Sequence, residues 1–72
     1  MIDVGSSVRI RPSQKGWWFG RFYVGIEGEV TAITRILGVT TYHVRPEGHH
    51  FELPFRESEL VELDERGMPR WP

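Results

Sequence analysis

Short runs of β-branched and aromatic residues, separated by glycine, proline or serine, recur along the chain, and no stretch of about eleven residues has the apolar spacing of a helix. Val8 and Ile10 alternate with arginines, which is typical of a half-buried strand. The segment Pro46-Glu47-Gly48 is a tight-turn signal between two such runs. We therefore predict five strands, at residues 8–11, 28–34, 40–45, 50–53 and 61–63.

The length of the chain limits how these strands can be arranged. Seventy-two residues make one small domain, and bending a single sheet into a small antiparallel barrel protects its edges. Residues 14–25 are expected to form a long structured loop, and residues 55–60 suit one short helical turn before the last strand. We expect the barrel to span residues 1–64, followed by a flexible tail at residues 65–72, which contain two prolines and a glycine.

Three motifs carry a resemblance to a known family: Val-Gly-x-x-Val-Arg at residues 4–9, Gly-x-Glu-Gly-Glu-Val at residues 25–30 and Phe-Arg-x-x-Glu at residues 55–59. Together they resemble the variable chain of ferredoxin–thioredoxin reductase, which implies an all-β, five-stranded antiparallel SH3-like barrel. The photosystem I peripheral SH3-type subunit and the C-terminal barrel of the nitrile hydratase β subunit resemble the pattern more distantly. KOW domains share the Gly-x-x-Gly-x-Val approach to a strand, in which Gly25 and Gly28 are expected to permit a turn.

The resemblance also implies a function. The reductase variable chain implies a non-catalytic regulatory subunit that binds a larger iron–sulfur catalytic subunit, so that any cofactor belongs to the partner and this chain has none. The KOW resemblance implies the alternative of a nucleic-acid-binding module associated with the ribosome or RNA polymerase. A small phage-type inhibitor of a host protein is a third interpretation that the size and acidity of the chain permit.

Few residues could carry chemistry. The chain has no cysteine, which excludes a thiolate nucleophile and a Cys-ligated metal. The histidines are His43, His49 and His50, but adjacent histidines on a strand point to opposite sides, and we predict no metal site. The acidic residues after position 56 are interpreted as a solvated face. We find no nucleophile–base spacing and no phosphate-binding loop, and we predict that the chain is not an enzyme.

The most informative segment has five aromatic residues within seven positions, with Lys15 and Arg21 beside or among them. The side chains of consecutive residues cannot all face one core. Some of the rings therefore either contact a partner or fold over the open end of the barrel, and the sequence leaves both alternatives open. Tryptophan, tyrosine and arginine dominate the binding energy of protein interfaces. The five aromatic residues are Trp17, Trp18, Phe19, Phe22 and Tyr23.

Charge is unevenly distributed, although the formal net charge is −1. Residues 1–26 contain four basic residues and one acidic residue, whereas residues 47–65 contain one basic and seven acidic residues. A net charge this small gives no long-range attraction to phosphates, but a surface with both signs suits orientation against a protein. We predict a cytoplasmic chain with a protein partner, nucleic acid as the alternative partner, and no membrane contact. The predicted contact residues are Arg9, Arg11, Trp17, Trp18, Phe19, Arg21 and Tyr23.

Overall fold

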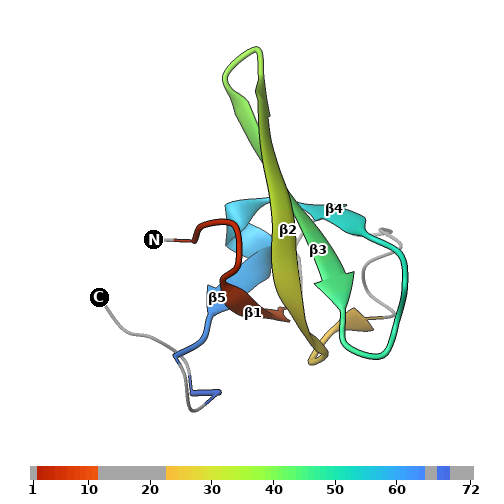
Figure 1. The fold of residues 1–72 in the computed structure, drawn as a ribbon. Coiled ribbons are helices and arrows are strands. Elements are labelled where there is room, and N and C mark those ends of the chain that lie inside the picture. The colour runs from red at the N-terminus through yellow and green to blue at the C-terminus, as the bar shows by residue number, and fades with distance from the viewer. Residues whose placement is uncertain (1, 12–22, 65–66, 69–72) are drawn as a thin grey trace.

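The computed structural model describes residues 2–11, 23–64 and 67–68, and their regular structure is almost entirely β (Figure 1). None of the helical structure within these ranges has the length and apolar character needed to cross a membrane. The strands are β1 (Ser7–Ile10), β2 (Glu27–Ile36), β3 (Val39–Pro46), β4 (Leu53–Phe55) and β5 (Leu60–Glu62), and the 3-10 turn η2 spans Glu57–Glu59.

The five strands form one antiparallel sheet in the order β4-β3-β2-β1-β5. Strands that follow one another from β1 to β4 are neighbours, and β5 returns to pair with the free side of β1. The predicted fold class is confirmed: the protein is all-β, with five antiparallel strands and one short helical turn before the last. The long first loop of that prediction falls mostly on residues 12–22, which lie outside the described residues.

Alternate residues of the strands build the core, because successive side chains of a strand point to opposite faces of a sheet. Val8 and Ile10 of β1 are buried, as predicted from their alternation with arginines. Val30 of β2 and Val44 of β3 are paired across the sheet and are also buried. Phe55 of β4 completes the same cluster and is the largest of its fully buried side chains. One face of the curled sheet therefore supplies the core.

The long strand β2 contains one irregularity. Its register with β3 shifts between Val30 and Ala32, so Thr31 is the extra residue of a β-bulge. The bulge moves the core-facing position from Val30 to Ile33, which is partly buried against the core. It accounts for the imperfect apolar alternation of this segment in the sequence.

The turn between β2 and β3 has only two residues. Ile36 pairs with Val39, which leaves Leu37 and Gly38 as the turn, and both have positive φ, +52° and +78°. Positive φ at both central residues is the requirement of the type I′ turn, whose twist matches that of the flanking strands. The predicted turn around Gly38 is confirmed.

The fourth strand begins later than predicted, at Leu53–Phe55 instead of residues 50–53. The backbone N–H of His49 donates to the carbonyl of Pro46 at 3.0 Å, which closes the turn, and the chain then bends before it reaches β4. Both segments have similar apolar content, so the sequence pattern does not separate them. The observed strand includes Pro54, which an edge strand tolerates because its missing N–H breaks no ladder.

The turn η2 confirms the predicted helical turn and corrects the interpretation of its acidic residues. Glu59 is only 8% exposed, and its Oε1 accepts a hydrogen bond from the backbone N–H of Arg56 at 2.7 Å. The exposed Glu57 accepts a hydrogen bond from the hydroxyl of Tyr42 through its Oε2 at 3.4 Å. A solvated face is therefore wrong for Glu59, because the start of a helical turn offers a carboxylate unpaired N–H groups.

The described part of the predicted tail forms a hydrogen-bonded turn. The backbone N–H of Met68 donates to Oδ1 of Asp64 at 2.9 Å, and the N–H of Asp64 donates to the carbonyl of Met68 at 2.7 Å. Arg9 donates through Nη2 to the carbonyl of Gly67 at 3.4 Å. The flexibility predicted for residues 65–72 otherwise concerns residues outside the described ranges and stays a prediction.

Candidate functional site

Three of the seven predicted contact residues, Arg9, Arg11 and Tyr23, lie in the described part of the chain. The structure does not bring them together in one patch. Arg9 lies on the face of β1 opposite the buried Val8, whereas Tyr23 packs against the core cluster. The other four predicted residues, Trp17, Trp18, Phe19 and Arg21, lie outside the described residues, and their contact role stays a prediction.

Tyr23 belongs to a cluster of three rings that come from two connections of the sheet. Its ring centroid lies 5.7 Å from that of His49 and 6.0 Å from that of Phe51, both in edge-to-face arrangements. The rings of His49 and Phe51 are 4.9 Å apart. Such geometries are the favoured ones for aromatic pairs. Tyr23 and His49 are half-buried and Phe51 is 42% exposed, so this aromatic cluster joins the core to the surface.

Two tight turns hold the aromatic cluster in place. Gly25 has a φ of +87°, and its N–H donates to the carbonyl of Ile10 at 2.8 Å, which fixes the turn after Tyr23 to the end of β1. Gly48 has a φ of +83° in the turn that precedes His49. Glycine adopts these left-handed conformations without the steric cost of a Cβ. The expectation that Gly25 permits a turn is confirmed.

Gly28 has a different role from the predicted one. It lies within β2 between Val8 and Pro46, and it is not among the glycines with positive φ. A Cβ at this position would come within 2.6 Å of the carbonyl oxygen of Arg45 and 2.8 Å of Cγ1 of Val44. The close approach of two strands, and not a turn, therefore requires glycine here.

The arginines on the outer face of the sheet are paired with carboxylates. Nη2 of Arg9 lies 3.0 Å from Oε2 of Glu27, its register partner on β2. Nη2 of Arg45 lies 3.0 Å from Oε1 of Glu29, again across paired strands. Exposed cross-strand pairs of this kind contribute little stability, but each neutralises a cation. Arg11 is exposed at the end of β1.

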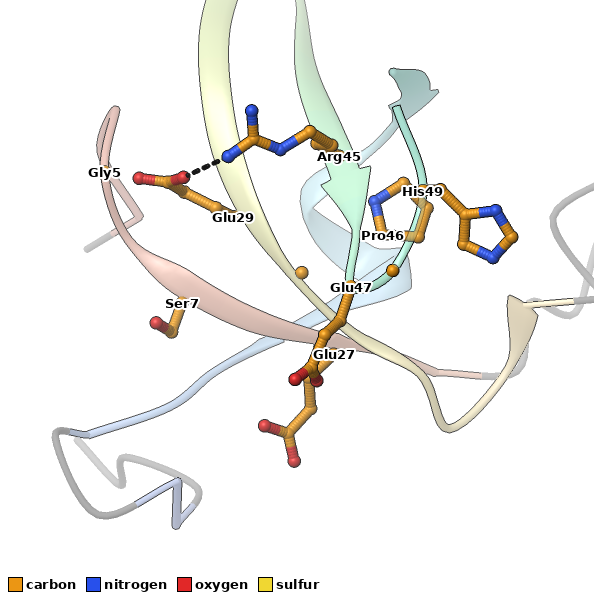
Figure 2. A pocket seen from close by; sticks show the side chains of 10 residues that line it. Gly5, Ser7, Glu27, Glu29, Arg45, Pro46, Glu47 and His49 are labelled. Atoms are coloured by element: carbon orange, nitrogen blue, oxygen red, sulfur yellow. Dashed lines mark hydrogen bonds and ion pairs between the residues drawn. The ribbon is translucent and has the colours of Figure 1, made fainter. Parts of the chain in front are cut away.

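An open depression of about 470 Å³ adjoins the aromatic cluster, and His49 lines it. Figure 2 shows the Arg45–Glu29 ion pair on one side, with Glu27 and Glu47 pointing together away from it. The backbone N–H of Glu47 donates to the carbonyl of Glu27 at 2.8 Å, which places these two carboxylates on adjacent backbones. The lining has three carboxylates and one guanidinium, so its charge is negative. Its remaining residues are Gly5, Ser7, Gly28, Pro46 and Gly48.

The titratable groups of the described residues are mostly separate from one another. Among the described residues, no three His, Cys, Asp or Glu side chains are grouped closely enough to hold a metal ion. Burial raises the pKa of the Tyr42 hydroxyl, and the nearby Glu57 carboxylate raises it further. Tyr42 is a core residue and takes no part in the depression. The side chain of His43, on the outer face, lies 3.2 Å from Oγ1 of Thr34 through Nε2.

The sequence analysis missed two members of the aromatic cluster. It assigned Phe51 to a strand and considered His49 only as a candidate metal ligand. The feature of the sequence that could have indicated the cluster is an aromatic residue, Phe51, three positions after the turn glycine Gly48, where its ring can pack against another loop. Comparison with known proteins adds no further assignment: no family model, curated protein or solved structure matches this chain significantly.

Proposed function

We propose that the chain is a non-catalytic, cytoplasmic protein-binding module, an SH3-like barrel that acts as an accessory subunit of a larger protein. The observation that supports this most is the aromatic cluster of Tyr23, His49 and Phe51, whose rings pack on one another in fixed positions. Rings that are ordered before binding lose little conformational entropy when a partner docks. Aromatic side chains that join a core to the surface are also the usual anchors of protein interfaces.

The contact surface that we propose extends from the aromatic cluster toward Val24 and Arg11. Val24 is 40% exposed beside Tyr23 in the sequence, and Arg11 is exposed at the end of β1. The aromatic residues Trp17, Trp18 and Phe19, with Arg21, precede Tyr23 in the chain and are proposed as the rest of the surface on the sequence argument. If the resemblance to the reductase variable chain is functional, the partner is an iron–sulfur catalytic subunit that carries its own cofactor.

The charges of the described surface favour a protein partner over a nucleic acid. Arg9 and Arg45 are each neutralised by a glutamate at 3.0 Å, and the neighbouring depression is lined by three carboxylates. Binding to a nucleic-acid backbone requires several cations that are able to replace counterions. A surface with paired charges and an acidic hollow instead supports electrostatic complementarity with a protein.

Affinity measurements on matched variants test this proposal. The full chain is used to capture its partner from a native lysate, and the partner is identified by mass spectrometry and purified. We expect Phe51→Ala to weaken binding by about tenfold or more, because truncating an interface anchor costs at least about 1.4 kcal/mol. The control is Ile36→Ala, an exposed apolar residue in the β2–β3 hairpin, which should change the affinity by less than about twofold.

Two results would overturn the proposal. Equal affinity of wild type and Phe51→Ala, with both chains folded, would show that the aromatic cluster is not the contact surface. Retention of the wild-type chain on RNA at low salt, with a steep loss as salt is added, would favour the KOW-like alternative.

A further inference from the structure

The β2–β3 hairpin extends beyond the rest of the sheet as a two-stranded arm (Figure 1). β1 pairs with β2 only as far as Glu29. Beyond it, the N–H of Gly5 donates to the carbonyl of Val30, and the N–H of Val30 donates to the carbonyl of Ser6. β4 pairs with β3 only as far as Tyr42. We define the arm as residues 32–41, which among the described residues take part in β2–β3 pairing only. Two strands without further support are marginally stable in water.

The end of the arm exposes apolar side chains. Leu37 is 98% exposed and Ile36 is 69% exposed, and Val39, the register partner of Ile36, is exposed as well. Leu37 also has a φ of +52°, a conformation that costs an L-residue about 1–2 kcal/mol. Arg35 is the one charged residue in the arm. Exposed apolar side chains and a strained turn residue are features typical of interaction surfaces.

The two edges of the arm differ in the backbone groups that they present. The pair Ile36–Val39 closes a two-residue turn and is therefore a hydrogen-bonded pair, after which antiparallel pairs alternate. Ile33 and Arg35 occupy the alternate pairs, so their N–H and C=O groups point away from β3 toward the outer edge of β2. On the β3 side, Thr40 is the one arm residue in that orientation. The β2 edge thus offers the longer ladder.

The other two edges of the sheet are protected. β4 and β5 have three residues each, and β4 includes Pro54. Short strands and proline are the usual devices that stop an edge from pairing with another chain. The β2 edge of the arm has neither device, and three of its five residues 32–36, Ile33, Thr34 and Ile36, are β-branched strand formers.

We propose that the arm pairs with the arm of a second copy of this chain, edge to edge along β2, to form a symmetric dimer. The register places Thr34 on the two-fold axis, opposite Thr34 of the other copy. Ile33 of each copy then lies opposite Arg35 of the other, and these are the residues whose backbone groups face the open edge. The two arginines are never directly opposed, and Ile36 comes beside Ala32 of the other copy. The backbone groups of Ile33 and Arg35 in one copy then face those of Arg35 and Ile33 in the other, so the edge is complementary to itself in hydrogen bonding.

A single introduced thiol tests this register, because the chain has no cysteine. Thr34→Cys places two thiols directly opposite each other across the axis, at a Cα separation of about 4.5–5.5 Å that a disulfide spans. The matched control is Thr41→Cys, the register partner of Thr34 on the same face of the arm. In the proposed dimer its two copies are separated by three strand spacings, about 14 Å, which is beyond the reach of a disulfide.

Under mild oxidation we expect Thr34→Cys to form at least about tenfold more cross-linked dimer than Thr41→Cys at equal concentration, since only the first pair satisfies disulfide geometry. Equal cross-linking of the two variants would overturn the edge-to-edge register. Sedimentation of the wild-type chain provides a measurement without any thiol. A concentration-dependent dimer is expected, and a chain that remains monomeric at several hundred micromolar would overturn the proposal.

A backbone variant separates pairing from folding. Arg35→Pro removes an N–H that points to the open edge and leaves the ladder between β2 and β3 intact, so we expect a folded monomer. Far-ultraviolet circular dichroism measures whether the variant is folded. If Arg35→Pro folds and still dimerises like wild type, the β2 edge is not the interface. If it does not fold, the comparison of Thr34→Cys with Thr41→Cys decides.

Discussion

Two regions of the sheet place the same kinds of residue in opposite environments: the arm, and the supported part, which we define as β1, β4, β5 and the residues of β2 and β3 outside the arm. Within the single strand β2, Val30 is fully buried, whereas Ile36 six residues later is 69% exposed. Among the described residues, Val30 has backbone partners in β3 and in the segment just before β1, whereas Ile36 has a strand partner only in β3. Both residues are apolar, so composition does not explain the difference. Val30 has more neighbouring strands than Ile36, and it lies on the core face of the sheet, whereas Ile36, three residues after the core-facing Ile33, lies on the other face.

The two regions also differ in the length of the strands that form their edges. In the supported part, β4 and β5 end after three residues. In the arm, β2 continues to its tenth residue with an outer edge that no other described strand covers. The supported part is therefore stabilised by its own contacts, and the proposed dimer would supply the strand neighbour that the arm lacks among the described residues. Variants that affect one region and spare the other test this division.

The largest effect is expected for Phe55→Ala in the core. Phe55 is 1% exposed, and truncating a buried phenylalanine costs about 3–5 kcal/mol. That loss is comparable with the whole stability of a domain of this size, about 4–11 kcal/mol. Chemical denaturation should therefore show a mostly unfolded or barely folded variant. Ile36→Ala in the arm is the matched control and should change the free energy of unfolding by less than about 0.5 kcal/mol. A similar loss in both variants would contradict the division.

The next effect is expected for Gly28→Ala, where two strands approach most closely. The added Cβ meets the backbone carbonyl of Arg45, which cannot rotate away as a side chain could. Overpacking of this kind costs about 1–3 kcal/mol, and thermal unfolding measures it. Gly38→Ala is the contrasting variant: a Cβ there meets no atom within 4 Å, so any loss comes from its φ of +78° alone. If Gly28→Ala unfolds at the wild-type temperature, the close approach has no energetic importance.

A smaller effect is expected from Tyr42, a core residue whose titration makes the free energy of unfolding depend on pH. Burial and the Glu57 carboxylate raise the pKa of Tyr42, so the folded chain keeps this proton at a pH where the unfolded chain loses it. The stability that comes from the raised pKa is fully present below pH about 10, the ordinary tyrosine value, and is lost as the pH rises through the higher pKa of the folded state. We predict that the free energy of unfolding falls above pH about 10.

Tyr42→Phe should reduce this alkaline fall and should cost about 1 kcal/mol at neutral pH through loss of the hydrogen bond to Glu57. Tyr23→Phe is the control for the second tyrosine of the chain. An alkaline fall that is unchanged in Tyr42→Phe would show that Tyr42 does not cause it.

The sequence predicts the supported part of the sheet better than the arm, for a physical reason. Alternation at Val8 and Ile10 reports burial on one face, and this requires only that other strands cover that face. β-branched residues in the segment 28–34 also indicate a strand, and the observed β2 includes them all. The number of residues by which the β2–β3 hairpin extends beyond the rest of the sheet depends on where β1 and β4 end. No local pattern contains that information, so the exposure of Ile36 and Leu37 is visible only in the structure.

The candidate site was predictable in part for a similar reason. The expected surface included Tyr23 because aromatic residues cluster around it in the sequence. It did not include His49 and Phe51, which are more than twenty residues away along the chain and reach Tyr23 only through the turn after β3. The ion pairs of Arg9 and Arg45 depend on strand register, which the sequence leaves undetermined. The predicted roles of Trp17, Trp18, Phe19 and Arg21 stay predictions.

The smallest effect is expected for Leu37→Asn at the tip of the arm, where monomer stability and association should change in opposite directions. Leu37→Asn should raise the stability of the monomer by about 0.5–1 kcal/mol, since asparagine tolerates positive φ and Asn-Gly is the preferred type I′ turn. No buried area is lost, because Leu37 is already 98% exposed. Thermal unfolding at low concentration measures this gain.

The same substitution removes an apolar side chain from the tip of the arm, so we expect Leu37→Asn to associate more weakly than wild type in sedimentation. A wild-type chain that is less stable as a monomer but associates more strongly would show that the leucine contributes to binding. If Leu37→Asn destabilises the monomer, Leu37 instead belongs to the supported part of the fold, and the division between the two regions is wrong at this residue.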